Sequence, residues 1–433
     1  MIILSTDERE LQILLDKITQ YANSHQYSLH PEKSHVIPFN CPSKSQVEAL
    51  NETRPWHINA QPIPVNHIST HLGIDRTSMS ANATVDARIL TARGTLYALM
   101  GAGLHGMNGL PIATSTHLYM VYVLPRLLYG LETISIDRPR LKSLEIFHRT
   151  TLRCIIGLPE RSAIAALHII TGQPTVEAHI HMRLLTLLHS MLCSPGPAQE
   201  IILRQYAIKD RTNSWVKIAK DILYEYDLPC IADIFLESPT KAEWKRSVKT
   251  AVLEKITTSM EKEANSKSTL KYLHKEFKPF NAHHTVINVN STRDVTRAAT
   301  KLRLLTGTYL LQDKLFKLGK SATAICRLCH KEEEDTVHFI VTCQFLEATR
   351  SKYMPAILNI LSPLNKEPSS ISPVSREVIT HLLLDHKHPI FTSHFNIRSQ
   401  DANVIEDITQ KLIYALHLRR AEALKSLSVK KNA

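Results

Sequence analysis

Residues 326–343 read Cys-Arg-Leu-Cys-His-Lys-Glu-Glu-Glu-Asp-Thr-Val-His-Phe-Ile-Val-Thr-Cys and gather four side chains of the kind that bind zinc. They are Cys326, Cys329, His338 and Cys343, with two, eight and four residues between them. Thiolates and an imidazole are the ligands of tetrahedral structural zinc sites, and a Cys-x2-Cys turn brings two sulfurs to one ion. Because four protein ligands leave no position open for water, the spacing predicts a structural zinc site without a catalytic role.

The segment between the two halves of this pattern predicts how the ligands are presented. Residues 331–335 are all charged, which favours a loop, and Thr336 is a candidate cap for a short helix that carries His338. Cys343 lies five residues after His338, so this helix has to tighten or to end near Cys343 before both side chains can reach one ion. His330 is a further nitrogen donor, and we expect it to be exposed.

The composition of the chain indicates a helical, basic protein. It has 433 residues, 43% of them hydrophobic, and only 12 glycines, which allows a sizeable core and disfavours a loop-rich β fold. The formal net charge is +12. Since a basic surface attracts polyanions, RNA or DNA is the expected class of partner. A basic surface without such a role is the alternative, and no small-molecule substrate is evident.

Apolar periodicity predicts a mainly α fold after a small mixed segment. The first 80 residues combine one helix with short strand-like runs at 34–39, 56–58 and 63–68, and residues 40–55 look like a loop. Further along, residues 198–280 contain several helices, and the proline- and serine-rich residues 362–374 indicate a linker. Apolar residues at helical spacing mark the individual helices at 7–24, 82–101, 113–131, 139–156, 174–193, 292–306 and 402–428.

No segment indicates secretion or membrane insertion. The apolar start of the chain is too short for a signal peptide, and runs such as residues 163–170 are too short to span a bilayer. Seven cysteines spread over a long chain do not suggest a disulfide framework. We therefore expect a protein of the cytoplasm or nucleus with no membrane partner.

Two of the predicted helices carry basic stripes that suit phosphate contacts. In the helix at 292–306, the basic residues recur at intervals of four, and in the helix at 139–156 they fall within about 40° of one another around the axis. Lysine and arginine contact phosphates without reading base sequence, although most charged stripes are simply solvated faces. The candidate nucleic-acid residues are Lys142, Arg149, Arg153, Arg293, Arg297, Lys301 and Arg303.

Several segments together resemble the C-terminal part of a non-LTR (LINE-type) retrotransposon reverse transcriptase. Residues 301–307 (Lys-Leu-Arg-Leu-Leu-Thr-Gly) followed by the Cys/His pattern resemble the zinc-binding region of that family. Residues 124–132 (Leu-Pro-Arg-Leu-Leu-Tyr-Gly-Leu-Glu) resemble its thumb segment. Residues 71–74 (His-Leu-Gly-Ile) resemble the end of its palm, and residues 29–34 resemble its Leu-Asn-x-x-Lys-Thr segment with His30 and Ser34 as departures.

The resemblance implies an order of regions along the chain. They are a partial palm at 1–80, a helical thumb-like region at 81–195, a helical linker region at 196–290, a basic helix with the zinc knuckle at 291–361, and a linker with the C-terminal helix at 362–433. The partner that this order implies is a template–primer type RNA or DNA.

Polymerase chemistry is implied only for an intact parent protein. In the family, residues 1–5 would directly follow the Tyr-x-Asp-Asp motif that helps hold the catalytic magnesium ions, and a third carboxylate lies further upstream. The 433 residues contain no Asp-Asp pair, and no Pro-Asp pair of the kind found in the nuclease of some relatives. We therefore assign no catalytic residue, and magnesium is expected only with the intact polymerase.

Three functional hypotheses follow. The first is a non-catalytic fragment that binds RNA or DNA through the thumb-like region and the zinc knuckle. The second is a reverse transcriptase that is active only within a longer polyprotein or with another chain. The third is a zinc-stabilised helical scaffold for protein interactions.

Overall fold

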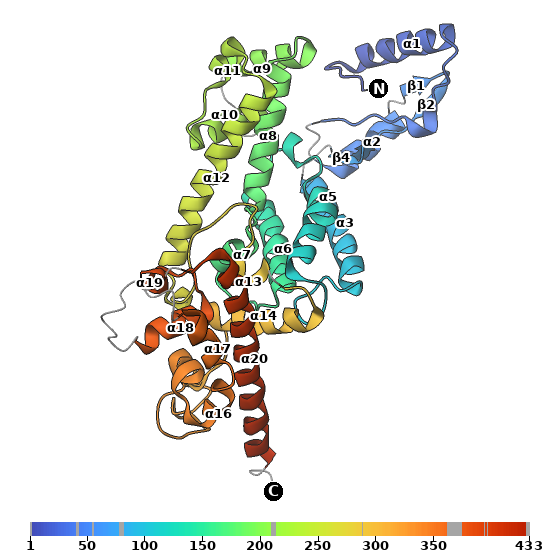
Figure 1. Cartoon of the computed structure of the whole chain (residues 1–433). Coiled ribbons are helices and arrows are strands. Elements are labelled where there is room, and N and C mark those ends of the chain that lie inside the picture. Colours follow the sequence, from blue (N-terminus) through green and yellow to red (C-terminus); the bar gives the residue numbers. More distant parts are fainter. Residues whose placement is uncertain are drawn as a thin grey trace.

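The computed structural model describes residues 2–39, 43–53, 56–77, 82–208, 214–287, 289–361, 375–393, 395 and 397–429. Figure 1 shows a small N-terminal α/β unit, a body of long helices, and a C-terminal helical region crossed by the last helix. The protein is mainly helical, which confirms the predicted class, and the described strands form two separate antiparallel hairpins. Within the described ranges, no helix has both the length and the apolar character needed to cross a bilayer.

The N-terminal unit has its own small core. Helix α1 (Glu8–Ser24) begins where the Asp7 side chain accepts hydrogen bonds from the Arg9 and Glu10 amides, and it packs on the hairpin of strands β1 (Trp56–Ile58) and β2 (Gln61–Ile63). In that hairpin Trp56 lies opposite Ile63. The buried side chains of this core are Leu15, Val47, Trp56, Ile58, Ile63 and Val65.

Three local predictions for this unit are wrong. The segment 40–55 is not a loop, because residues 44–53 form helix α2 (Lys44–Thr53), whose Val47 packs into the small core. The run at 34–39 contributes only one bridge, between Val36 and Val65, after a 3-10 turn η1 (Pro31–Lys33). The run at 63–68 is mostly the connection between two hairpins. Both runs are short and broken by prolines, which cannot donate to a strand ladder.

A second hairpin, β3 (Ile68–His71) and β4 (Ile74–Thr77), joins this unit to the helical body. The Tyr129 hydroxyl donates to the Leu72 carbonyl at 2.8 Å, and the Arg88 guanidinium donates to the Gly73 carbonyl and lies over the Tyr129 ring. Gly130 adopts a left-handed conformation (φ +78°) against the Ile74 side chain. The contact therefore joins residues 71–74 to residues 124–132, two segments that are distant in sequence.

Replacing Gly130 by alanine is expected to destabilise this junction by about 1–2 kcal/mol, because the left-handed backbone is costly for any residue with a Cβ. The added Cβ would also lie 2.7 Å from the side chain of Ile74. Urea unfolding of the full chain measures the effect. Gly94→Ala is the matched control: this glycine lies inside helix α3 (Asn82–Gly101) with nothing within 4 Å of a new Cβ, so alanine there should stabilise by about 0.5–1 kcal/mol. Equal effects of both substitutions would contradict the assigned role of Gly130.

The helix predicted at 113–131 is divided in the structure. It consists of α4 (Ile112–Leu118), the π-helical segment η2 (Tyr119–Val123) and α5 (Leu124–Leu128). Pro125 explains the division, because proline has no amide hydrogen and its ring clashes with the carbonyl four residues earlier. A wider π turn relieves this clash without ending the helix.

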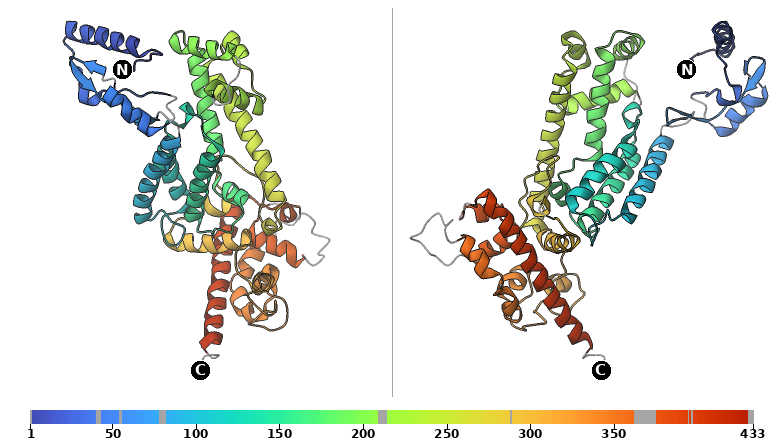
Figure 2. Two further views of the ribbon diagram at one scale, coloured as in Figure 1. Left: turned by 180° about the vertical axis from the view of Figure 1, so that it is seen from behind. Right: turned by 45° about the vertical axis from the view of Figure 1, so that its right-hand side comes forward.

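The helical body is built around two long neighbouring helices, α8 (Val176–Leu192) and α12 (Lys241–Asn265), which run side by side in Figures 1 and 2. The Trp244 indole of α12 donates to the Leu185 carbonyl of α8 at 2.8 Å. Around them lie the 3-10 turns η3 (Leu131–Thr133) and η4 (Ser268–Leu270) and the helices α6 (Arg138–Ile156), α7 (Ile164–Thr171), α9 (Pro197–Ala207), α10 (Trp215–Glu225) and α11 (Ile231–Glu237).

The C-terminal region packs onto the base of this body. Its longest element, α20 (Ser399–Val429), crosses α14 (Thr292–Leu305), as Figure 1 shows. The remaining described elements are α13 (His284–Ile287), α15 (Gln312–Lys317), η5 (His338–Thr342), η6 (Gln344–Leu346), α16 (Glu347–Arg350), α17 (Met354–Leu361), α18 (Arg376–Leu384) and α19 (Pro389–Thr392).

One hydrophobic cluster runs from Val85 to Leu416, so the region boundaries expected at 195/196 and 290/291 do not separate independent cores. The linker predicted at 362–374 lies outside the described residues.

Candidate metal centre and basic helices

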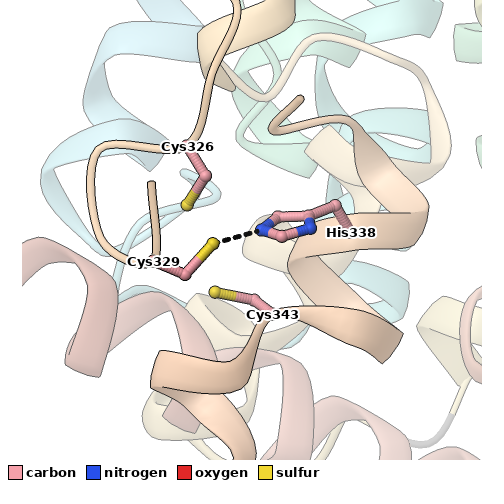
Figure 3. Close-up of side chains that lie close together, drawn as sticks. All are labelled: Cys326, Cys329, His338 and Cys343. Atoms are coloured by element: carbon pink, nitrogen blue, oxygen red, sulfur yellow. Dashed lines mark hydrogen bonds between the residues drawn. The ribbon is translucent and has the colours of Figure 1, made fainter. Parts of the chain in front are cut away.

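The first two candidate zinc ligands lie on a tight turn closed by backbone hydrogen bonds. The Cys326 amide donates to the Glu332 carbonyl at 2.8 Å, and the Glu334 amide donates to the Ala324 carbonyl at 3.0 Å. Between these pairs, His330 has a left-handed backbone conformation (φ +56°), and its amide donates a hydrogen bond to the Cys326 carbonyl. The His330 side chain is exposed, as predicted. The turn presents Cys326 and Cys329 on one side, facing His338 and Cys343 (Figure 3).

The last two ligands come from a helix that widens and then ends. Its first turn is capped by Asp335, whose carboxylate accepts the His338 amide at 2.7 Å, so the expected cap at Thr336 is displaced by one residue. From His338 the helix is of the π type, and the Cys343 amide donates to the His338 carbonyl at 2.8 Å. In an α-helix, residues five apart point about 140° away from each other. The π turn, closed between residues five apart, brings both side chains to one side.

The four ligands converge in a largely buried position. The three cysteine sulfurs and one imidazole nitrogen all lie within 4.8 Å of one another. Cys326, His338 and Cys343 are buried and Cys329 is half-buried. The His338 Nε2 lies 3.3 Å from the Cys329 sulfur (Figure 3). A hydrogen bond from Cys326 lowers the pKa of the Cys343 thiol, as expected of closely neighbouring sulfurs. The donor set and its closeness fit a tetrahedral zinc ion.

Two supporting interactions were not evident from the spacing. Glu332 accepts a hydrogen bond from Nδ1 of His338 at 3.1 Å, which turns Nε2 toward the sulfurs, as carboxylates commonly do for zinc-bound histidines. The buried Arg350 donates to the Ile340 and Cys343 carbonyls at 2.8 and 3.1 Å and so holds the end of the π turn. Neither residue could be identified without the fold, because a charged residue near a cysteine has many possible partners.

The last helix also contacts the candidate metal centre. Arg420 of α20 makes two hydrogen bonds of 2.7 Å to the carboxylate of Glu334, and both side chains are buried. The same guanidinium lies over the rings of Tyr309 and Phe339. Arg420 therefore joins the C-terminal helix to the segment that carries the four candidate ligands.

The structure corrects one candidate nucleic-acid residue. Lys301 is 1% exposed, and its ammonium contacts Glu406 and Thr409 of α20, each at 2.8 Å. A spacing of eight residues turns a helix by about 80° beyond two full turns, so Lys301 rotates away from Arg293 and under the neighbouring helix. Lys301 is therefore a buried structural residue and cannot contact phosphate.

The other six candidates remain at least partly accessible. Lys142 and Arg293 are exposed, whereas Arg149, Arg153, Arg297 and Arg303 are half-buried. Arg297 pairs with Asp294 at 2.8 Å. Burial lowers the pKa of Arg153 somewhat, although an arginine remains charged. Five of the seven predicted basic residues form no ion pair within 4.0 Å among the described residues, although Glu145 and Glu160 act electrostatically on two of them. The five are Lys142, Arg149, Arg153, Arg293 and Arg303.

The two basic helices meet at the C-terminal end of α6. Arg303 of α14 donates twice to the Gly157 carbonyl, at 3.1 and 3.0 Å, and Arg153 lies one turn earlier on α6. Arg161 is exposed and donates to the Thr308 carbonyl at 2.6 Å. Helical periodicity did not identify it as a candidate, because it follows the end of α6. We call Arg153, Arg161 and Arg303 the arginine corner. Its members donate to backbone carbonyls and form no ion pair within 4.0 Å among the described residues, although Glu160 acts electrostatically on Arg153.

The chain matches no protein-family model, and no curated protein matches it.

Proposed function

We propose that the chain is a metal-stabilised helical module that binds RNA or DNA, related to the C-terminal part of a non-LTR retrotransposon reverse transcriptase. The observation that carries the binding proposal is the group of cations on α6 and α14, together with Arg161 just after α6, that form no ion pair within 4.0 Å among the described residues. Lysine and arginine side chains without a carboxylate partner can form ion pairs with nucleic-acid phosphates. Such phosphate contacts contribute most of the affinity in sequence-independent binding. Position beside a Cys3His centre supports the same reading.

The proposed relationship rests on residues that meet in space. The segments compared with the end of a palm and with a thumb contact each other directly, through the hydrogen bond of Tyr129 to Leu72 and the packing of Gly130 against Ile74. The segment compared with the zinc-binding region carries the four clustered ligands. Polymerisation is proposed only for a longer or complemented protein, because residues 1–433 contain no Asp-Asp pair to hold magnesium. A zinc-stabilised interaction scaffold remains the second candidate, favoured if nucleic acid does not bind.

Charge reversal at the exposed ends of the two basic helices is expected to weaken nucleic-acid binding about tenfold or more at low salt. The test variant is Lys142→Glu with Arg293→Glu, measured by fluorescence anisotropy with labelled single-stranded RNA and duplex DNA. Each phosphate contact contributes about 0.9 to the slope of log K against log salt on duplex DNA, so the slope should become shallower by about two.

The matched control reverses two exposed lysines at the start of α12, Lys241→Glu with Lys245→Glu, which makes the same change in net charge. This control is expected to bind nearly as the unaltered chain does. Binding that is absent at low salt would reject nucleic acid as the partner and favour the scaffold. Equal losses in the two double variants would show that net charge alone, and not these helices, accounts for binding.

A further inference from the structure

We infer that a second divalent metal ion binds inside the protein, in a cluster of histidines and carboxylates that shares no residue with the Cys3His centre. The cluster contains two overlapping groups, His283–His284–Asp385 and His284–His386–Glu406, and the ligand atoms of each group lie within 4.8 Å of one another. The rings of His283 and His284 are 4.0 Å apart, and those of His284 and His386 are 4.3 Å apart. The inference does not rest on nucleic-acid binding.

Segments distant in sequence build this cluster at the junction between the helical body and the last helix. His283 and His284 stand at the start of α13, Asp385 is the C-cap of α18 with His386 next to it, and Glu406 lies on α20. Asp385, His386 and Glu406 are between 0% and 4% exposed. Burying several ionisable side chains together is unfavourable unless an opposite charge or a metal ion pairs with them, because an unpaired buried charge is costly.

The charged groups around the cluster suit a cation. The buried carboxylates of Asp385 and Glu406 both face the histidines, and the Lys301 ammonium contacts Glu406 at 2.8 Å. Neutral imidazoles and ionised carboxylates are the forms that bind metals. With the imidazoles neutral, the two carboxylates and the Lys301 ammonium leave a net charge of −1, which attracts a cation.

Several atoms of the cluster that could bind a metal ion have no hydrogen-bond partner among the described residues. They are Nδ1 and Nε2 of His386 and Oε2 of Glu406, together with Nε2 of His283 and of His284. Nε2 of His283 and of His284 lie 3.3 and 3.0 Å from the Asp385 oxygens, and Nδ1 of His386 lies 3.5 Å from Oε2 of Glu406, but none of these pairs is aligned for a hydrogen bond. Leaving buried polar atoms unpartnered costs about 1–3 kcal/mol each, whereas a metal ion would use their lone pairs.

Other polar contacts orient the ligands without occupying these atoms. The Thr285 hydroxyl is 2.9 Å from Nδ1 of His283, which leaves Nε2 for the ion. Lys301 and Gln410 contact only Oε1 of Glu406, at 2.8 and 3.0 Å. Such supporting hydrogen bonds are typical of metal sites. Nitrogen and carboxylate ligands without sulfur suit zinc and similar divalent transition metals, and an ion here would tie α13, α18 and α20 together.

Metal analysis of the full chain, purified without chelator in zinc-supplemented medium, tests the inference. We expect about two zinc ions per chain, one at each centre, and about one in the variants His284→Ala and Asp385→Asn. The control is His381→Gln: His381 is buried on α18 with both ring nitrogens unpartnered but belongs to neither ligand group, so this variant should keep both ions. About one ion in the unaltered chain, unchanged in His284→Ala, would overturn the inference in favour of a cluster held by a protonated histidine or water.

Cobalt(II) titration of the metal-stripped, unaltered chain gives an answer that does not depend on the folding of a variant. Cobalt at the Cys3His centre produces intense thiolate charge-transfer absorption, whereas cobalt bound by nitrogen and oxygen does not. We expect the charge-transfer band to saturate at about one equivalent while about one further equivalent binds without it. Binding that stops when the band saturates would refute the second site. Absence of the band would instead count against the Cys3His centre, so the two failures are distinguishable.

Discussion

Replacing Cys343 by serine is expected to remove zinc from the Cys3His centre and to cost on the order of 5 kcal/mol of stability or more. The centre holds together residues 318–343, which contain little regular structure besides the π turn η5. Without the ion, the turn at Cys326 and the π turn have only a few backbone hydrogen bonds to keep them in place. If zinc occupies this centre, its binding free energy would therefore be a large part of the folding free energy of this segment.

Zinc content and urea unfolding of the full chain measure this effect, and limited proteolysis should show new cleavage between residues 318 and 343. Cys193→Ser is the matched control, because Cys193 is a half-buried thiol at the end of α8 and lies outside the clustered ligands. Chelation of the unaltered protein should reproduce the Cys343→Ser result. A Cys343→Ser protein that retains both its stability and a thiolate-bound metal would contradict the four-ligand centre.

Lys301→Met is expected to destabilise the protein by about 3–5 kcal/mol, because it leaves the Glu406 carboxylate buried without its cation. Lys301 and Glu406 are each 1% exposed and 2.8 Å apart, at the crossing of α14 and α20. Urea unfolding at neutral pH, with zinc held at one saturating concentration, measures the loss. Lys411→Met is the control, since Lys411 forms an ion pair with Asp407 on the exposed face of α20 and such pairs contribute about 0–1 kcal/mol.

The pH dependence of this pair has a definite sign. Burial alone raises the pKa of Glu406, but the Lys301 ammonium, with His386 and His284 nearby, lowers it well below the ordinary value of 4.5. The unaltered pair therefore contributes its full stability above about pH 4.5 and loses it as the pH falls. In Lys301→Met burial dominates and the pKa rises, so the variant should gain stability on acidification. The double variant Lys301→Met with Glu406→Gln should recover part of the loss; no recovery would show that the pair is not the cause.

Apolar residues at helical spacing made several helices predictable from the sequence, and the structure shows that capping residues set where they begin and end. Helix α6 begins after its N-cap Asp137 and ends before its C-cap Gly157. At the start of α14, the Ser291 side chain accepts a hydrogen bond from the Asp294 amide. Both helices therefore lie close to the expected ranges. Helix α7 was not predicted, because almost every residue from Ile164 to Thr171 is buried and a helix enclosed on all sides has no polar face to reveal its period. Helix α2 was missed for the opposite reason, since a mostly polar segment buries only Val47.

The sequence by itself determined the four clustered ligands of the candidate zinc centre, because turns and single helical segments bring residues within a few positions of one another. It also determined the mainly helical class, through apolar periodicity. Only the tertiary structure decided that Lys301 is buried against Glu406, that Glu334 pairs with Arg420, and that His284 meets Asp385 and Glu406. These partners are about 85 to 120 residues apart, and their contacts depend on how whole helices cross, which local spacing does not encode.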